Sequence, residues 1–382
     1  MPSRASFLTG KMPIQLDIND NLDKLPKPEL VQEACIGNVL ANVGYESVYG
    51  GKWHVARGKL VEEGFGFTSI SDMDDDSLAI RCDRFIKQKH DKPFFMVASF
   101  DNPHNICEYA RNMTLPWGEV PERPAEQCPN LPYNFYPTIY GAEAVELQRS
   151  SDLIPRIHPT KSYTPDKWRQ YRDVYYRLVE KVDAEVGKVI KSLKEAKQYD
   201  NTVVIFFSDH GDGMGAHQWN QKRVMYQEVI NVPLIIKPGK KTKAKINSQA
   251  VVSLLDLIPT ICDYASAPIP KDAQGRSLRP LVEGADTLKN VANEVYVETL
   301  LDGVGPHARG WALVTPKYKY VLYNIYRNRE QLVDLENDPG ELLNLAVDNS
   351  YKDILEQMRG RMRDWAVKVD DKMLLRSLKK WE

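Results

Sequence analysis

Three short apolar segments of this chain each run directly into polar residues that can bind a ligand or a metal ion. The segments are 47–49, 94–99 and 202–207, and each has the length of one strand. Apolar runs that alternate with helices are typical of strands buried on both faces of an α/β sheet. Ligands bind at the carboxyl ends of the strands in open parallel sheets. We therefore expect the following residues at one edge of one sheet: Lys52, His54, His104, Asp209 and His210.

The sequence predicts helices between these segments. One spans 30–43, and the clearest begins at Thr164-Pro165, where proline occupies the first helical position. The apolar residues of the second helix recur at spacings of three and four, which is the helical period. A further strand is predicted at 232–236. The fold class predicted for residues 1–290 is α/β, a large domain with a mostly parallel, helix-flanked sheet.

The pattern changes after Asn293. Short strands are predicted at 294–300, 311–315, 318–323 and 331–335. Turn residues separate the last three, which favours an antiparallel meander, and a helix follows over 351–368. We predict a smaller C-terminal α+β domain, with an antiparallel sheet, over residues 291–382.

Two stretches carry no regular strand or helix pattern. Residues 105–163 are rich in proline, and so long a loop is usually a lid, a binding loop or a disordered segment. Its aromatic residues Trp117, Tyr133 and Phe135 either stack on the ring of a ligand or pack within the loop. The run Asp74-Asp75-Asp76 is predicted to be a solvated turn rather than a metal site.

The charge balance excludes two classes of binding protein. Lys plus Arg number 51 against 52 for Asp plus Glu, so the net charge is -1 and a general nucleic-acid or acidic-membrane binder is not expected. No apolar stretch is long enough to span a bilayer. The 5 cysteines show no zinc spacing and are too few for a disulfide scaffold, so most are predicted to be buried as small apolar residues. The sequence does not predict an oligomeric state.

Taken one at a time, the candidate residues leave several interpretations open. Asp209-His210 suits a metal pair, a general base with its partner, or a surface dipeptide. In an extended segment Lys52 and His54 point to the same side, where two donors suit an oxyanion, while Trp53 faces the core. His104 and Lys222 are equally well explained as ordinary solvated polar residues.

In combination, these segments resemble the formylglycine-dependent sulfatases of the alkaline phosphatase superfamily. The resemblance covers essentially the whole chain. It rests on six ordered blocks, MPSRASFLTGK at 1–11, GKWH at 51–54, NPH at 102–104, SDHGD at 208–212, QKRVMYQE at 221–228 and QLVDLENDPGELLNL at 331–345. Six blocks in the same order are far more specific than any one of them.

The resemblance implies a sulfuric ester hydrolase with a divalent cation, usually Ca²⁺, and a formylglycine nucleophile whose hydrate attacks sulfur. Arg4 matches the arginine that supports the formylglycine, and Asp209 and His210 match two ligands of the cation. Fixed cations and a metal in a dry crevice stabilise the charge that develops on a sulfate ester during cleavage.

The remaining matched residues belong to the sulfate pocket. Lys52 and His54 match residues that contact the formylglycine and the sulfate. His104 and Lys222 match groups that bind sulfate oxygens or protonate the leaving alcohol.

The resemblance departs from the family pattern at the start of the chain. Met1 occupies the variable position of the nucleophile signature, so the nucleophile would lie one residue earlier. The family's first strand, with its two metal-binding aspartates, has no counterpart either. We therefore expect these 382 residues by themselves to be hydrolytically inactive and to bind calcium weakly or not at all.

Substrate and location follow from the resemblance alone. We expect a sulfated glycan, with His307 and Arg309 of the loop 302–310 as candidate substrate-binding residues. We also expect the full-length form in the periplasm or outside the cell. The alternatives are a phosphodiesterase or phosphonate monoester hydrolase of the same superfamily, a non-catalytic carbohydrate-binding remnant, and a structural α/β protein with accidental motifs.

Overall fold

The computed structural model describes residues 1–18, 20–21, 25–55, 64–150, 159–240, 242–288, 292–305 and 307–379. Its helices are α1 (Pro2–Thr9), α2 (Pro28–Ala34), α3 (Ile36–Asn42), α4 (Asp75–Ile86), α5 (Ile106–Ala110), α6 (Glu143–Ser150), α7 (Pro165–Glu195), α8 (Gln227–Ile230), α9 (Leu257–Ala265), α10 (Arg279–Val282), α11 (Lys352–Lys368) and α12 (Lys372–Leu378). No helix within these residues is long and apolar enough to cross a membrane.

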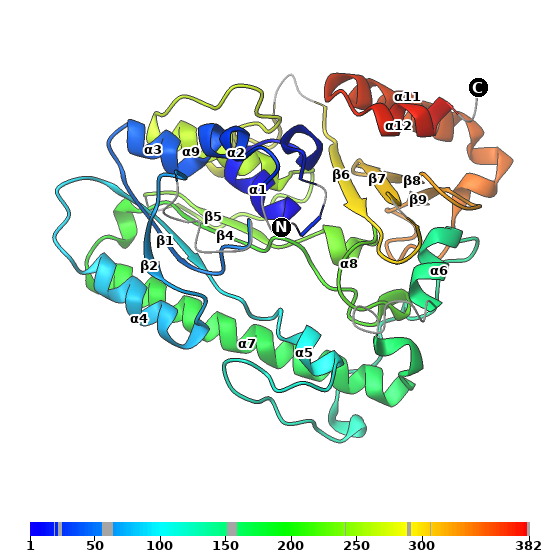
Figure 1. The fold of residues 1–382 in the computed structure, drawn as a ribbon, viewed down its shortest axis with the longest axis horizontal. Coiled ribbons are helices and arrows are strands. Elements are labelled where there is room, and N and C mark those ends of the chain that lie inside the picture. Colours follow the sequence, from blue (N-terminus) through cyan, green and yellow to red (C-terminus); the bar gives the residue numbers. More distant parts are fainter. Residues whose placement is uncertain are drawn as a thin grey trace.

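Two small sheets with helices on both sides form the N-terminal part of the molecule (Figure 1). β1 (Glu46–Gly51) lies between β2 (Thr68–Ser71) and β3 (Phe94–Ser99), and it is parallel to both. β4 (Val204–Phe207) and β5 (Leu234–Lys237) form an antiparallel pair. Helices α4 and α7 pack together on one side, and α1, α3 and α9 lie on the other. The predicted α/β class is confirmed. The expectation of one sheet is wrong for the described residues, because Lys52 and His104 follow strands of the first sheet and Asp209 follows β4 of the second.

A cavity of about 1330 Å³ separates the two sheets and is continuous with the carboxyl ends of their strands. Residues of both β3 and β4 line it, and so do apolar side chains of α7. Among the described residues, no strand pairs with the cavity-facing edge of β3 or of β4. The backbone groups of these edges therefore lack the sheet partners that a central strand normally has.

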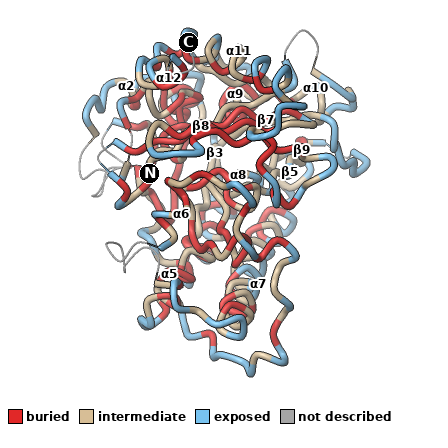
Figure 2. Tube along the Cα trace, turned by 90° about the vertical axis from the view of Figure 1, so that its right-hand side faces the viewer, coloured by how far each residue is buried: buried red, intermediate tan, exposed pale blue. Residues whose placement is uncertain are grey.

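The C-terminal part is an antiparallel sheet covered by two helices. Its strands are β6 (Val295–Leu300), β7 (Arg309–Val314), β8 (Tyr318–Tyr323) and β9 (Glu330–Asp334), paired in chain order. The predicted meander is therefore confirmed. Figure 2 shows β7 and β8 as buried. One face of the sheet packs on α11 and α12, and the other packs on residues 219–229 and α6.

Several local predictions need correction. The helix predicted over 30–43 is two helices, because the backbone of Cys35 is extended between α2 and α3. The segment 105–163 contains α5 and α6, and Phe135 is buried in a cluster with α7, although residues 151–158 lie outside the described part. The predicted boundary at 290/291 also lies outside it. All five cysteines are buried, as predicted.

The prediction of a solvated turn at 74–76 is wrong. Asp74 caps α4 by accepting a hydrogen bond from the Asp76 amide. Asp75, 4% exposed, accepts hydrogen bonds from the backbone amides of Asp101 and Asn102 at 2.7 and 2.8 Å. Its carboxylate therefore holds the loop after β3, which carries His104.

Candidate active site

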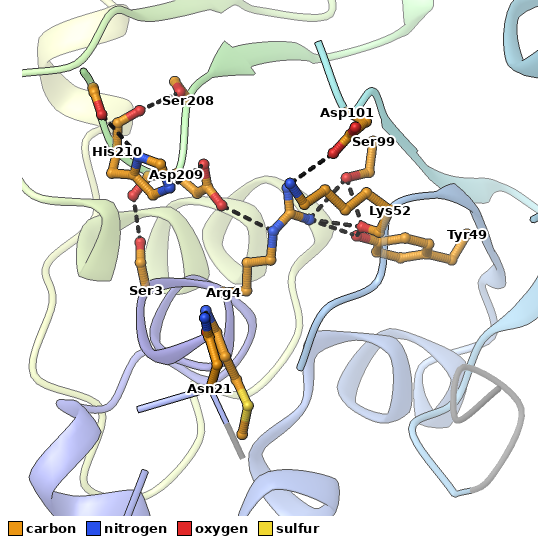
Figure 3. A network of polar contacts seen from close by, with 12 residues as sticks. Ser3, Arg4, Asn21, Tyr49, Lys52, Ser99, Asp101, Ser208, Asp209 and His210 are labelled. Carbon is orange, nitrogen blue, oxygen red and sulfur yellow. Dashed lines mark hydrogen bonds and ion pairs between the residues drawn. The ribbon is translucent and has the colours of Figure 1, made fainter. Parts of the chain in front are cut away.

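Helix α1 positions Arg4 at the carboxyl ends of three strands. The helix begins with Pro2 and ends at Gly10, whose φ of 72° is a left-handed conformation that suits glycine. The buried guanidinium of Arg4 donates to the Asp209 carboxylate at 2.9 Å, to the Lys52 carbonyl at 2.7 Å and to the Ser99 hydroxyl at 2.9 Å (Figure 3). One side chain therefore joins the ends of β1, β3 and β4.

Lys52 is buried and paired with a carboxylate that sequence reasoning missed. Its ammonium lies 2.7 Å from the Asp101 carboxylate, and both side chains are less than a tenth exposed. Asp101 lies directly after β3, in the same run as His104. This position at a strand end is the sequence feature that would have indicated Asp101 as a site residue. Trp53 is buried against Tyr49, as predicted from the alternation.

Burial keeps His104 and His54 neutral at ordinary pH. Burial lowers the pKa of His104 to about 2, and the charges of Lys52 and Lys222 add to the shift. Burial also lowers the pKa of His54 to about 3, together with the charges of the Met1 amino group and Lys52. His104 lines the large cavity with Lys52 and Lys222, and His54 does not.

Asp209 and His210 offer two adjacent ligand groups for a cation. His210 Nδ1 lies 2.9 Å from the Gly211 carbonyl oxygen, an acceptor, so Nδ1 carries the proton and Nε2 is left as the ligand atom. This Nε2 lies 3.7 Å from a carboxylate oxygen of Asp209. Burial acts to raise the pKa of Asp209, but His210, Arg4 and the lysines hold it well below its usual range. Burial lowers the pKa of His210 to about 4.

Lys222 and the Met1 amino group are the remaining cationic groups near Asp209. Lys222 lines the cavity with His104 and Asp209, and burial lowers the pKa of its ammonium. Burial also lowers the pKa of the Met1 amino group to about 5, where it lies within electrostatic reach of Asp209 and Lys222. This amino group donates to the Asn21 side chain at 3.0 Å.

The structure does not bring the two candidate substrate-binding residues to this cavity. Arg309 is buried and lines a separate cavity of about 450 Å³ with Gln15 and Asp371. It alternates with Gly310 on β7 and shares the sheet face of Trp311, which packs on α11 and α12. His307 is exposed, and its carbonyl accepts a hydrogen bond from Asn324.

A second group of ligand-type side chains lies outside the predicted set. His217, Glu228 and Glu341 place ligand atoms within 4.8 Å of one another, and in the described part of the chain no other such group of three is found. The Lys319 ammonium contacts the Glu341 carboxylate, so a protein cation already neutralises one of these three ligand groups. Sequence reasoning missed the group because its members are far apart in the chain.

The neutral histidines predict that the protein loses stability in acid. In the unfolded chain a histidine gains its proton near pH 6.5, whereas His54, His104 and His210 gain theirs only near or below pH 4. Between these values the unfolded state binds more protons, so the free energy of unfolding falls as the pH falls below about 6.5. Each proton contributes about 1.4 kcal/mol per pH unit, and His210, whose side chain is 31% exposed, contributes less.

Urea unfolding of the printed chain at pH 7.5, 6 and 5 measures this slope. His104→Gln is expected to reduce the slope by about one proton. A free energy of unfolding that does not change between pH 7.5 and 5 would show that these histidines are not buried in the neutral form.

The arrangement defines a class of protein. Buried cations, neutral imidazoles and a carboxylate–imidazole pair lie together at the carboxyl ends of sheet strands, where they line one cavity. Such a set stabilises the oxygens of a tetrahedral anion and leaves room for a divalent cation. The fold and the site are those of an α/β hydrolytic enzyme acting on esters of a tetrahedral oxyanion.

The comparison with known families identifies the chain further. The sulfatase family profile matches residues 1–267, and the profile for the C-terminal region of N-sulphoglucosamine sulphohydrolase matches residues 215–368. The chain belongs to the sulfatase family, whose members hydrolyse sulfate esters with a metal ion and a formylglycine residue.

Individual relatives support this membership. The Delta 4,5-hexuronate-2-O-sulfatase of Bacteroides thetaiotaomicron is 30% identical over 97% of this chain and 79% of that protein. The structure of a 2-O GAG sulfatase superposes with a TM-score of 0.81 at 27% identity, over 97% of this chain and 82% of that one. A phosphonate monoester hydrolase from Silicibacter pomeroyi, with a TM-score of 0.71 at 20% identity, covers 98% of this chain and 87% of its own and shares the fold.

The residues at the site fit the metal ion and the formylglycine in part. Asp209 and His210 supply two ligand atoms of the kind a divalent cation takes, and Asp209 is ionised. Within the residues that the structure describes, neither belongs to a group of three possible ligands. Arg4, the residue that the resemblance matches to the arginine supporting the formylglycine, donates to the Asp209 carboxylate at 2.9 Å.

Proposed function

We propose that the protein removes sulfate esters from a sulfated glycan that contains uronic acid, with a 2-O-sulfated hexuronate as its first candidate substrate. The observation that carries this proposal is the cavity that Lys52, His104 and Lys222 line together at the carboxyl ends of β1 and β3. The substrate class is supported by the relative named for hexuronate-2-O-sulfatase activity, which matches 97% of this chain.

We assign the sulfate oxygens to Lys52 and His104. The pair with Asp101 holds the Lys52 ammonium in one place, so no reorganisation is needed when the sulfate arrives. His104 is neutral, so it acts as a hydrogen-bond donor and not as an acid. Lys52 is buried and His104 is half-buried, and this lowers the local dielectric constant and strengthens their interaction with an anion.

We assign the proton for the leaving alcohol to Lys222. Burial lowers the pKa of its ammonium, which makes Lys222 a stronger acid than an exposed lysine. The neutral His104 has no proton of comparable acidity to give. A formylglycine residue would supply the attacking hydroxyl, and a divalent cation, which we propose to be Ca²⁺, would be held by Asp209 and His210 and would supply positive charge there.

The test uses the protein expressed from its whole open reading frame in a host that makes formylglycine. We expect sulfate release from an unsaturated 2-O-sulfated uronate disaccharide at a higher kcat/KM than from a 6-O-sulfated glucosamine. Calcium binding, followed by calorimetry, is expected to weaken in Asp209→Asn and not in the exposed control Asp200→Asn.

Three other results would change the proposal. Faster cleavage of phenyl phosphonates than of sulfates would make the protein a phosphonate monoester hydrolase. Saccharide binding without turnover would make it a carbohydrate-binding protein. Equal turnover of 2-O- and 6-O-sulfates would contradict the assignment of a 2-O-sulfated hexuronate as the substrate. Export from the cytoplasm stays a prediction that needs its own localisation experiment.

A further inference from the structure

The C-terminal sheet contributes a deeply buried ion pair at its contact with the N-terminal part. Lys319 of β8 and Glu341 have side chains that are 1% and 3% exposed, and the Lys319 ammonium contacts the Glu341 carboxylate. Lys319 shares a strand face with Val321 and Tyr323, which pack on residues 219–229. The pair therefore faces the segment that follows Lys222.

Both members of the pair also bind the main chain of that segment. The Lys319 ammonium donates to the carbonyl of Met225, and the Glu341 carboxylate accepts from the amide of Gln227 at 2.6 Å. These two groups lie on either side of Tyr226. One ion pair thus holds the backbone three to five residues after Lys222.

Other contacts hold the same segment closer to Lys222. The Arg223 guanidinium pairs with Asp302 of the C-terminal part at 2.7 Å and with Asp20 at 2.8 Å. The Trp219 indole donates to the Lys222 carbonyl at 3.2 Å. Lys222 is therefore held from both sides of its position in the chain, and the contact with Asp302 comes from the C-terminal part.

Stability alone does not account for the Lys319–Glu341 pair. Removing two charges from water is costly, and apolar residues of similar size are often as stable in such a place. An apolar pair, however, could not bind the Met225 carbonyl and the Gln227 amide. A metal ion is not needed to neutralise Glu341 either, because the Lys319 ammonium already contacts it.

We propose that Lys319 and Glu341 are positioning residues for Lys222: they fix the main chain at Met225 and Gln227 and so set where the Lys222 ammonium stands in the cavity. The effect on turnover rests on the proposed function, in which Lys222 gives its proton to the leaving alcohol. The effect on the segment itself does not.

The test compares variants of this pair with variants of a matched one. Lys319→Met breaks the pair, and Lys319→Met/Glu341→Met replaces both charges with apolar side chains. The control, Arg359→Met, breaks the pair between Arg359 of α11 and the buried Glu330 of β9, and α11 packs on the sheet face opposite to residues 219–229. All variants are made in the protein expressed from its whole open reading frame.

We expect Lys319→Met to lower kcat at least tenfold and to speed amide exchange over residues 222–228, with a smaller change in KM. In the double variant we expect Tm to recover at least in part while kcat stays low. Arg359→Met is expected to lower Tm and to leave kcat and the exchange of 222–228 unchanged.

The outcomes separate this proposal from the function on which it rests. Recovery of kcat together with Tm in the double variant would overturn the positioning role, because it would show a purely structural pair. Unchanged exchange over 222–228 in Lys319→Met would overturn it as well. If the unaltered protein releases no sulfate, the proposed function fails, and the exchange measurement decides the positioning of the segment by itself.

Discussion

Replacing Arg4 with Met is expected to lower the free energy of unfolding of the printed chain by about 3–5 kcal/mol. The substitution leaves the Asp209 carboxylate, which is 19% exposed, without its 2.9 Å partner. It also removes the Arg4 donors to the Lys52 carbonyl and the Ser99 hydroxyl, while the Lys52 carbonyl keeps its hydrogen bonds from the Tyr49 and Ser99 hydroxyls. Urea unfolding followed by circular dichroism measures the change.

Two further variants make this result interpretable. Lys27→Ala removes an exposed ion pair with Asp17, so we expect a change of about 0.5 kcal/mol or less. Arg4→Lys keeps the charge but not the several donors of the guanidinium, so it should lie between the unaltered chain and Arg4→Met. A change below about 1 kcal/mol for Arg4→Met would show that the junction of the strand ends does not depend on Arg4.

Replacing Lys222 with Ala is expected to lower kcat for the sulfated disaccharide by about 10²–10³-fold, by analogy with the removal of one oxyanion donor. The ammonium lines the cavity with His104 and is proposed to protonate the leaving alcohol. Burial lowers the pKa of Lys222, so its positive charge destabilises the folded state. We therefore expect the Tm of Lys222→Ala to equal or exceed that of the unaltered protein.

A matched lysine and a series of substrates with different leaving groups give the controls for Lys222. Lys191→Ala alters a lysine on α7 whose side chain is 75% exposed, and it should leave kcat and Tm unchanged. The loss in Lys222→Ala should be smaller for substrates with better leaving groups, because these need less protonation. Turnover within twofold of the unaltered protein would remove Lys222 from the active site.

The elements that the sequence predicted well are those with a strong local pattern. β1, β3 and α7 lie where alternation, apolar runs and the Thr164-Pro165 start place them. Asp75 was misjudged because a run of three aspartates has the local pattern of an exposed turn, whereas its amide partners lie 26 and 27 residues away. Local pattern carries no information about such a partner.

The position of Arg309 shows how strand register decides which way a side chain faces. Successive side chains of a strand point to opposite faces, so Arg309 shares the face of Trp311 and packs toward α11 and α12. The face that packs on residues 219–229 is given by Ala308 and Ala312. The packing of the C-terminal sheet on the N-terminal part decides which of its two faces contacts residues 219–229.

The sequence by itself determined which residue types stand at the ends of the strands. Strand length, helical period and the ordered blocks depend on neighbouring residues, and so they can be read locally. The tertiary structure alone decided which of these residues meet: Asp101 with Lys52, Asp75 with the loop after β3, and Lys319 and Glu341 with the segment of Lys222. These contacts join residues 26 to 114 positions apart, so they exist only once sheets and helices have packed in one arrangement.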